Sequence, residues 1–166
     1  MGAVLPVDTL VNIRQQLRTQ KKKVVFTNGC FDLIHRGHVE YLTKARALGD
    51  VLIVGINTDR SVREIKGANR PLVGQDDRAF IVATLTPVDY TCLFDEATPL
   101  DLITRIVPDV LVKGADWKVG DVVGKDVVEQ AGGRVATVEF LPNRSTSGII
   151  QLILDRFSTL NPRSPR

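Results

Sequence analysis

Short apolar runs rich in β-branched residues alternate along this sequence with segments whose apolar residues recur at helical spacing. Each run spans only a few residues and is bounded by polar residues or glycine, which is typical of a strand buried on both faces. We expect strands at residues 23–27, 51–56, 88–94, 110–112 and 135–140. Strands that alternate with helices predict an α/β fold, an open parallel sheet of about five strands with helices on both faces.

The segments between these runs carry the stripes of amphipathic helices. Val39, Leu42, Ala45 and Leu48 mark one helix, which is expected to end near Gly49. We expect further helices at residues 7–20, 76–85, 99–107, 125–131 and 147–158. A chain of 166 residues fits one domain, so we predict a single domain over residues 1–166 with a loose tail at about 160–166.

Composition argues against several classes of partner. The 22 basic residues are scattered and aromatic residues make up only 5%, so a nucleic-acid surface is not expected. No apolar run approaches the roughly 20 residues of a membrane helix, and the first residues lack the features of a secretory signal. We therefore expect a cytoplasmic protein without a membrane partner. Cys30 and Cys92 lie far apart in the sequence and are expected to be reduced thiols.

Polar residues follow four of the five predicted strands. Open parallel sheets bind ligands outside the carboxyl ends of their strands, so these segments are expected to meet at one edge. The segments are Asn28 to His38, Asn57 to Asp59, Lys113 to Trp117 and Pro142 to Ser147.

Both histidines of the chain, His35 and His38, lie in the first of these segments, with Gly37 between them, and Gly37 and His38 are expected at the start of the following helix. A helix start offers unpaired N–H groups and the positive end of the helix dipole, and glycine leaves an anion room to approach. Two imidazoles on one turn would add two donors, which predicts a polyphosphate cradle. Metal ligands or internally satisfied polar groups are the alternatives. Only Cys30 and Asp32 are local, too few for a metal site, so none is expected.

The usual phosphate-binding signatures, the P-loop and the Gly-x-Gly-x-x-Gly turn, are missing from the sequence. Gly-Cys-Phe-Asp after a strand, followed by His-x-Gly-His, resembles the cytidylyltransferase-like nucleotidyltransferase superfamily, which implies a Rossmann-like sheet. Residues 55–59, 66–71, 111–117 and 145–147 resemble its later blocks in the same order. Within the superfamily, TNGCFDLIHRGH and DVLVKGADW look most like the D-glycero-β-D-manno-heptose 1-phosphate adenylyltransferases of lipopolysaccharide inner-core biosynthesis.

The resemblance implies transfer of AMP from ATP to heptose 1-phosphate, giving ADP-heptose and pyrophosphate, with Mg²⁺ arriving on ATP. A phosphate monoester is already ionised near neutral pH, so no strong general base is needed. In some organisms this activity is fused to a sugar kinase, which a chain of 166 residues is expected to lack. A cytidylyltransferase acting on glycerol phosphate and a nucleotide-binding module without turnover are the alternatives. The expected partners are small molecules, and a homodimer is left open.

The resemblance also assigns roles to residues. His35, His38 and Lys44 are implied as catalytic; spacing alone cannot choose between Lys44 and Arg46, and the resemblance favours Lys44. The implied nucleotide-binding residues are Cys30, Phe31, Gly37, Lys113, Gly114, Asp116, Ser145, Thr146 and Ser147. The implied residues for the acceptor substrate are Asn28, Gly29, Asp32, Asn57, Asp59, Lys66 and Arg70.

Each of these roles has a plainer alternative. Lys44 could be a solvated surface lysine, and Lys66 and Arg70 could belong to an ordinary surface loop. Asp32 and Asp116 could be turn aspartates. Residues 145–147 could simply cap the last helix, a role compatible with phosphate binding. The Cys30 thiol is expected to pack rather than react, and the role of Arg144 is left open.

Overall fold

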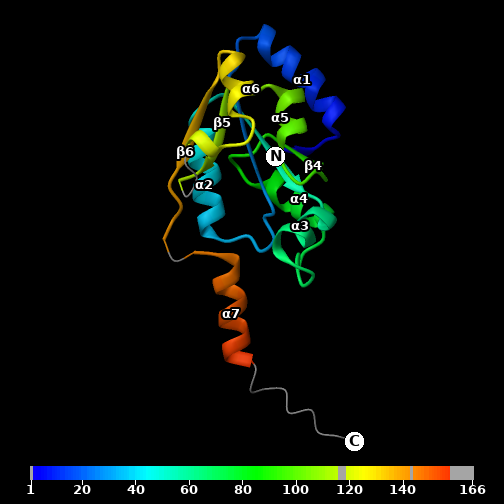
Figure 1. Cartoon of the computed structure of the whole chain (residues 1–166), viewed down its shortest axis with the longest axis vertical. Coiled ribbons are helices and arrows are strands. Elements are labelled where there is room, and N and C mark those ends of the chain that lie inside the picture. Colours follow the sequence, from blue (N-terminus) through cyan, green and yellow to red (C-terminus); the bar gives the residue numbers. More distant parts are fainter. Residues whose placement is uncertain (1, 116–118, 143, 158–166) are drawn as a thin grey trace, which may run out of the picture.

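The computed structural model describes residues 2–115, 119–142 and 144–157 of the chain. Its centre is a parallel sheet (Figure 1). The sheet has six strands in the order β1-β4-β3-β2-β5-β6. The strands are β1 (Ala3–Val4), β2 (Val24–Gly29), β3 (Val51–Asn57), β4 (Tyr90–Phe94), β5 (Val110–Gly114) and β6 (Arg134–Val138). The predicted α/β class and parallel sheet are therefore confirmed.

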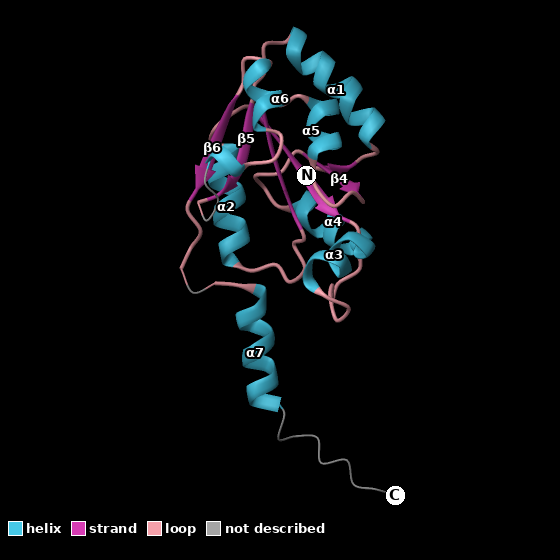
Figure 2. Cartoon of the chain, in the orientation of Figure 1, coloured by secondary structure: helices cyan, strands magenta, loops and turns pink. Residues whose placement is uncertain are grey.

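Helices cover the sheet on both faces (Figure 2). They are α1 (Val7–Thr19), α2 (Arg36–Arg46), α3 (Asp59–Lys66), α4 (Gln75–Thr84), α5 (Leu100–Ile106), α6 (Lys125–Gln130) and α7 (Thr146–Phe157), with a short 3₁₀ helix at Val119–Asp121. Helices α2 and α4 pack on one face, and α1, α5 and α6 pack on the other. Helix α7 extends away from the sheet (Figure 1), and none of its residues is buried.

Side-chain alternation along β2 explains the continuous apolar run. Val24 and Phe26 belong to the core with α5, whereas Val25 belongs to the core with Leu42 and Ala45 of α2. Successive side chains of a strand point to opposite faces, so a strand covered on both sides needs apolar residues at every position. These five side chains are fully buried.

The strand order reverses between β2 and β5. From β2 the chain continues to β3 on one side, and it returns later to add β5 on the other side. Helices on either side of such a switch point leave a crevice at the carboxyl ends of the two strands. Asn28 and Gly29 end β2 there, and Lys113 and Gly114 end β5.

Two parts of the chain differ from the sequence prediction. Strand β1 is additional, because a two-residue strand at the sheet edge is too short to show a period. Residues 59–66, expected as part of a loop, form α3, whose first turn is capped when Thr58 Oγ1 accepts from Ser61 N at 3.2 Å. Lys66 therefore ends a helix. Asp116 and the tail at about 160–166 lie outside the described residues.

Candidate active site at the switch point

His35 and His38 form one stacked pair at the start of α2. His35 occupies the N-cap position in an extended conformation, and His38 N donates to His35 O at 2.9 Å. The two rings lie 3.9 Å apart between centroids with 23° between their planes. Among the described residues, the buried side-chain nitrogen and oxygen atoms without a hydrogen-bond partner are the two Nδ1 atoms. Buried polar atoms are rarely left unpaired, so this pair is a candidate for binding a ligand.

Burial keeps both imidazoles neutral near pH 7. Burial, with a smaller contribution from the neighbouring His35, lowers the pKa of His38 to about 4. Burial also lowers the pKa of His35, with a smaller contribution from the positive charge of Arg144. Each ring therefore carries one N–H and no charge in the free protein, and an anion placed beside it would favour the protonated form.

Two glycines allow the rings of this turn to pack. A Cβ atom on Gly29 would lie 3.0 Å from the ring of Phe31, which is buried and lies 5.2 Å from His38 between centroids. A Cβ atom on Gly37 would lie 3.0 Å from the His35 ring and 3.2 Å from Arg144 Cβ. The space beside Gly37 is thus filled by His35 and Arg144. The sequence prediction was that an anion would approach there.

Positive charge lies at the carboxyl ends of the two strands that flank the switch point. The Lys113 ammonium of β5 donates to Asn28 Oδ1 of β2 and links the two strands. Lys113 is half-buried, and Gly114 next to it is buried. A partly desolvated ammonium at this edge of the sheet attracts a phosphate more strongly than one in bulk water does.

A model of one protein family matches residues 26–150, three quarters of the chain, and its description is cytidylyltransferase-like. The chain belongs to the cytidylyltransferase-like family. The matched residues include both histidines, the switch point and the start of α7. Family membership thus covers every part of the crevice described above.

Three similar proteins show which members of the family this chain resembles. The bifunctional protein HldE of Citrifermentans bemidjiense is 54% identical over 91% of this chain and 31% of its own length. HldE of Campylobacter concisus is 57% identical over 81% of this chain and 28% of its own. The chain spans about a third of these relatives. A lipopolysaccharide core biosynthesis protein from Thermoplasma volcanium has a similar structure, with a TM-score of 0.60 and 26% identity over 72% of this chain and 97% of its own.

In this cytidylyltransferase-like chain, two residues predicted to bind the acceptor substrate bind each other. The Asp32 carboxylate accepts from Arg70 Nε at 2.5 Å and from the backbone N–H groups of Leu72 and Val73 at 2.8 and 3.0 Å. Burial acts to raise the pKa of Asp32, but these hydrogen bonds outweigh it and lower the pKa. Asp32 therefore anchors residues 70–73, and a substrate that used it would have to displace Arg70.

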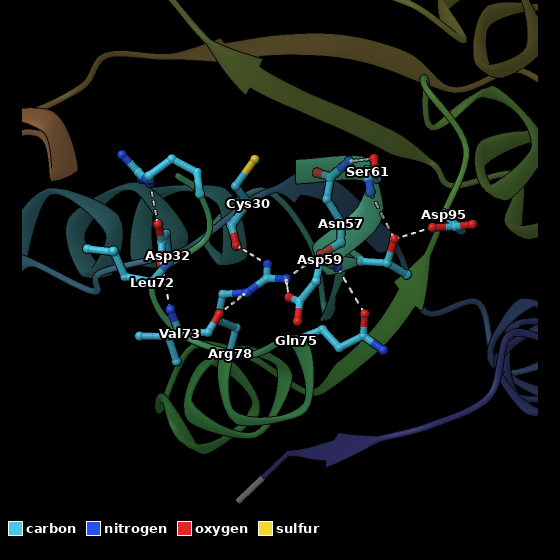
Figure 3. Close-up of polar contacts among 12 residues, drawn as sticks. Cys30, Asp32, Asn57, Asp59, Ser61, Leu72, Val73, Gln75, Arg78 and Asp95 are labelled. Carbon is cyan, nitrogen blue, oxygen red and sulfur yellow. Dashed lines mark hydrogen bonds and ion pairs between the residues drawn. The ribbon is translucent and has the colours of Figure 1, made fainter. Parts of the chain in front are cut away.

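A buried arginine forms hydrogen bonds with two other residues predicted to bind the acceptor substrate, Asn57 and Asp59 (Figure 3). Arg78 of α4 is fully buried and donates to the carbonyl oxygens of Val73 at 2.9 Å and Asn57 at 2.8 Å. It also donates to the carbonyl oxygen of Cys30 and to Asp59 Oδ1 at 2.7 Å. Arg78 is not among the residues predicted from the sequence. Its place beside Ala79 and Val82 on the buried side of α4 is a signal, because charge is rarely buried unpaired.

Lys44 and Arg46, the two basic residues in the last turn of α2, contact opposite edges of the sheet. Lys44 Nζ donates to the backbone oxygen of Glu139, just beyond the carboxyl end of β6. Arg46 lies 3.1 Å from Asp89, just before the amino end of β4, and donates to Gly49 O. Of the two candidates that spacing left open, Lys44 is the one near the carboxyl edge.

The remaining candidates have structural contacts. Ser145 Oγ accepts from Gly148 N at 3.0 Å, so it caps α7, and Thr146 Oγ1 donates to Leu33 O at 3.4 Å. Ser147 is exposed. The Cys30 thiol is half-buried, and burial raises its pKa, so it is protonated at neutral pH. A cleft of about 660 Å³ lies elsewhere, between α3 and α4. Its lining is more acidic than basic, which disfavours a triphosphate; the residues are Thr58, Asp59, Arg60, Arg63, Gly74, Gln75, Asp76, Asp77 and Asp95.

No helix in the part of the chain that the structure describes is long and apolar enough to cross a membrane.

Proposed function

We propose that this chain transfers AMP from ATP to D-glycero-β-D-manno-heptose 1-phosphate, releasing pyrophosphate and forming ADP-heptose for the lipopolysaccharide inner core. The observation that carries the chemistry is the stacked pair of His35 and His38 with two buried, unpaired ring nitrogens at the start of α2. The sugar is supported by the segments TNGCFDLIHRGH and KGADW and by the similarity to a lipopolysaccharide core biosynthesis protein.

The proposed reaction is a single displacement at the α-phosphorus of ATP. A phosphate oxygen of the sugar phosphate forms the new bond, and the bond to the β-phosphate breaks as pyrophosphate leaves with the electron pair. The nucleophile is already ionised, so positioning and charge stabilisation supply the catalysis. His35 and His38 donate to the oxygens on which negative charge builds, and the ammonium groups of Lys44 and Lys113 add positive charge at the same edge.

Further residues complete the proposed substrate sites. The start of α7, with Ser145 to Ser147, supports the β- and γ-phosphates through its N–H groups and hydroxyls. The end of β5 and Asp116 contact the nucleoside, and Lys66 and Arg70 bind on the side of the acceptor substrate. Mg²⁺ arrives as the ATP complex, because complexation by the metal offsets the charge of the triphosphate.

One assay tests this function directly. Pyrophosphate release is measured with ATP, CTP, GTP and UTP, each crossed with heptose 1-phosphate and with glycerol 3-phosphate. We expect ATP with heptose 1-phosphate to give the highest kcat/KM. A preference for CTP with glycerol 3-phosphate would replace the adenylyltransferase assignment by a cytidylyltransferase, and the absence of turnover with every pair would leave only nucleotide binding.

A further inference from the structure

The buried guanidinium of Arg78 joins three segments of the carboxyl edge. Its acceptors lie in the turn after β2, at the end of β3 with the first residue of α3, and in the loop before α4. The rigid fork of donors on an arginine can reach acceptors in several directions at once, which a lysine ammonium on its flexible stem does not reproduce. Arg78 is therefore built to fix the relative positions of these segments.

The turn after β2 needs such a restraint. Phe31 has a φ of 49°, a left-handed conformation that costs free energy for a residue with a side chain. The residues on either side of it are held: the Cys30 carbonyl by Arg78, and the Asp32 carboxylate by two backbone N–H groups. Val73 links the contacts on the two sides of Phe31, since its N–H donates to Asp32 and its carbonyl accepts from Arg78 (Figure 3).

The conformation of Phe31 bears directly on the histidine pair. Its buried ring lies 5.2 Å from His38 at an interplanar angle of 55°, and His38 in turn stacks on His35. If the Cys30 carbonyl were released, Phe31 could relax toward negative φ and its ring would leave His38. The orientation of both imidazoles would then change without any change in the residues that bear them.

We infer that Arg78 is a positioning residue of the proposed reaction: by holding the Cys30 carbonyl it keeps Phe31 left-handed, and through Phe31 it sets the orientation of His38 and His35. The kinetic part of this inference rests on the proposed function. Arg78 donates to Val73, Cys30, Asn57 and Asp59, so it acts on the histidines through Cys30 and Phe31.

Arg14 provides a matched control. It is likewise buried, donates to a carbonyl, Val107 O, at 3.0 and 3.1 Å, and pairs with an aspartate, Asp109, at 2.9 Å. Asp109 precedes β5, so this second buried arginine lies at the amino ends of the strands, the opposite edge of the sheet from the histidines. Arg14→Lys and Arg78→Lys make the same chemical change at the two edges.

The kinetic experiment compares these two variants below their melting temperatures. We expect Arg78→Lys to lower kcat about 10- to 100-fold with KM for ATP changed less than about threefold, because a displaced catalytic group loses transition-state stabilisation. Arg14→Lys should keep kcat within about twofold, since its edge holds no catalytic group. Equal kcat values for the two variants would contradict the positioning role and would show that Arg78 contributes to the structure alone.

A second measurement needs no substrate. The chain contains two histidines, so its imidazole NMR signals report on this pair alone. In the ligand-free protein, Arg78→Lys should shift both sets of signals and Arg14→Lys neither. If Arg78→Lys does not fold, the same NMR comparison is made with Asp59→Asn. This variant keeps an oxygen that accepts from Arg78 but removes the charge of the ion pair with its guanidinium. Unchanged imidazole signals in the folded variant would overturn the inference, even if the proposed sugar substrate proves wrong.

Discussion

At the scale of single residues, the chemistry of this site depends on burial more than on charged neighbours. His38 has its pKa lowered chiefly because its ring is taken out of water, and His35 follows the same pattern. Neutral rings cost less to bury than charged ones, and they can still donate to phosphate oxygens. The pair thus stays available for an anion without an internal counter-ion.

Replacing either histidine by alanine should impair the chemical step. His35→Ala and His38→Ala each remove one charge-stabilising donor, so we expect kcat to fall at least about 100-fold. Arg36→Ala is the control between them, because its exposed side chain forms an ion pair with Glu40 on the same helix. Steady-state pyrophosphate release and a circular dichroism spectrum would check activity and folding. Near-normal turnover in either histidine variant would exclude the proposed role.

The lowered pKa of His38 predicts a specific pH window for stability. The unfolded imidazole titrates near 6.5 and the folded one near 4, so protons bind the unfolded chain first. The free energy of unfolding should be constant above about pH 6.5 and should fall as the pH drops toward 4. The carboxylate of Asp32, whose pKa is lowered from 3.8, acts only at lower pH.

Two measurements check this window. Urea unfolding across it should show a weaker pH dependence in His38→Gln than in the unaltered chain, and the His38 imidazole NMR signal should titrate near pH 4. A midpoint near 6.5 would mean that the ring is hydrated in solution.

At the scale of elements, α2 joins the two edges of the sheet. Its first residues form the histidine turn, whereas Arg46 in its last turn pairs with Asp89 at the amino end of β4. Lys44 lies on the flank that reaches Glu139 beyond β6. The same helix therefore places Lys44 on the side of the proposed phosphates and Arg46 in a structural ion pair.

Alanine substitution separates these two flanks. Lys44→Ala should lower kcat/KM for ATP by about tenfold or more, because it removes positive charge from the phosphate side. Arg46→Ala should leave kcat/KM within about twofold and reduce the free energy of unfolding by at most about 1 kcal/mol, as is usual for partly exposed ion pairs. Equal, small kinetic effects would mean that Lys44 is an ordinary surface residue.

At the scale of the whole molecule, stability resides in the sheet and the helices that cover it. Most residues of β2 and β3 are buried. Helix α7 extends away from the sheet (Figure 1), and its Leu152, Ile153, Leu154 and Phe157 are exposed. A helix of 12 residues gains little stability without packing. The core should therefore unfold independently of substitutions in α7.

Two leucine substitutions test where the core lies. Leu52→Ala in β3, where the side chain is fully buried, should reduce the free energy of unfolding by about 2–5 kcal/mol. Leu154→Ala in α7, where the side chain is 55% exposed, should change it by less than about 0.5 kcal/mol. Chemical denaturation measures both. A large loss in Leu154→Ala would show that α7 packs against a surface in solution.

The sequence by itself determined the sheet, its helices and the position of the histidine turn, because these depend on local signals. Short apolar runs mark the buried strands and a period near 3.6 marks the helices, and the His-x-Gly-His turn directly follows a buried strand. The expected strands and helices lie within a few residues of the observed ones, apart from β1 and α3. Both exceptions lack an apolar period: β1 has two residues, and α3 is mostly polar.

Only the tertiary structure decided which polar residues bind one another. Asp32 and Arg70 were separate candidates in the sequence, yet they form an ion pair across 38 positions. Arg78 collects its acceptors from three segments, and Lys44 is distinguished from Arg46 only by what lies beside each flank of α2. Hydrogen bonds act over about 3 Å, and the chain folding that brings such groups together is set by burial of the whole core, which no local pattern encodes.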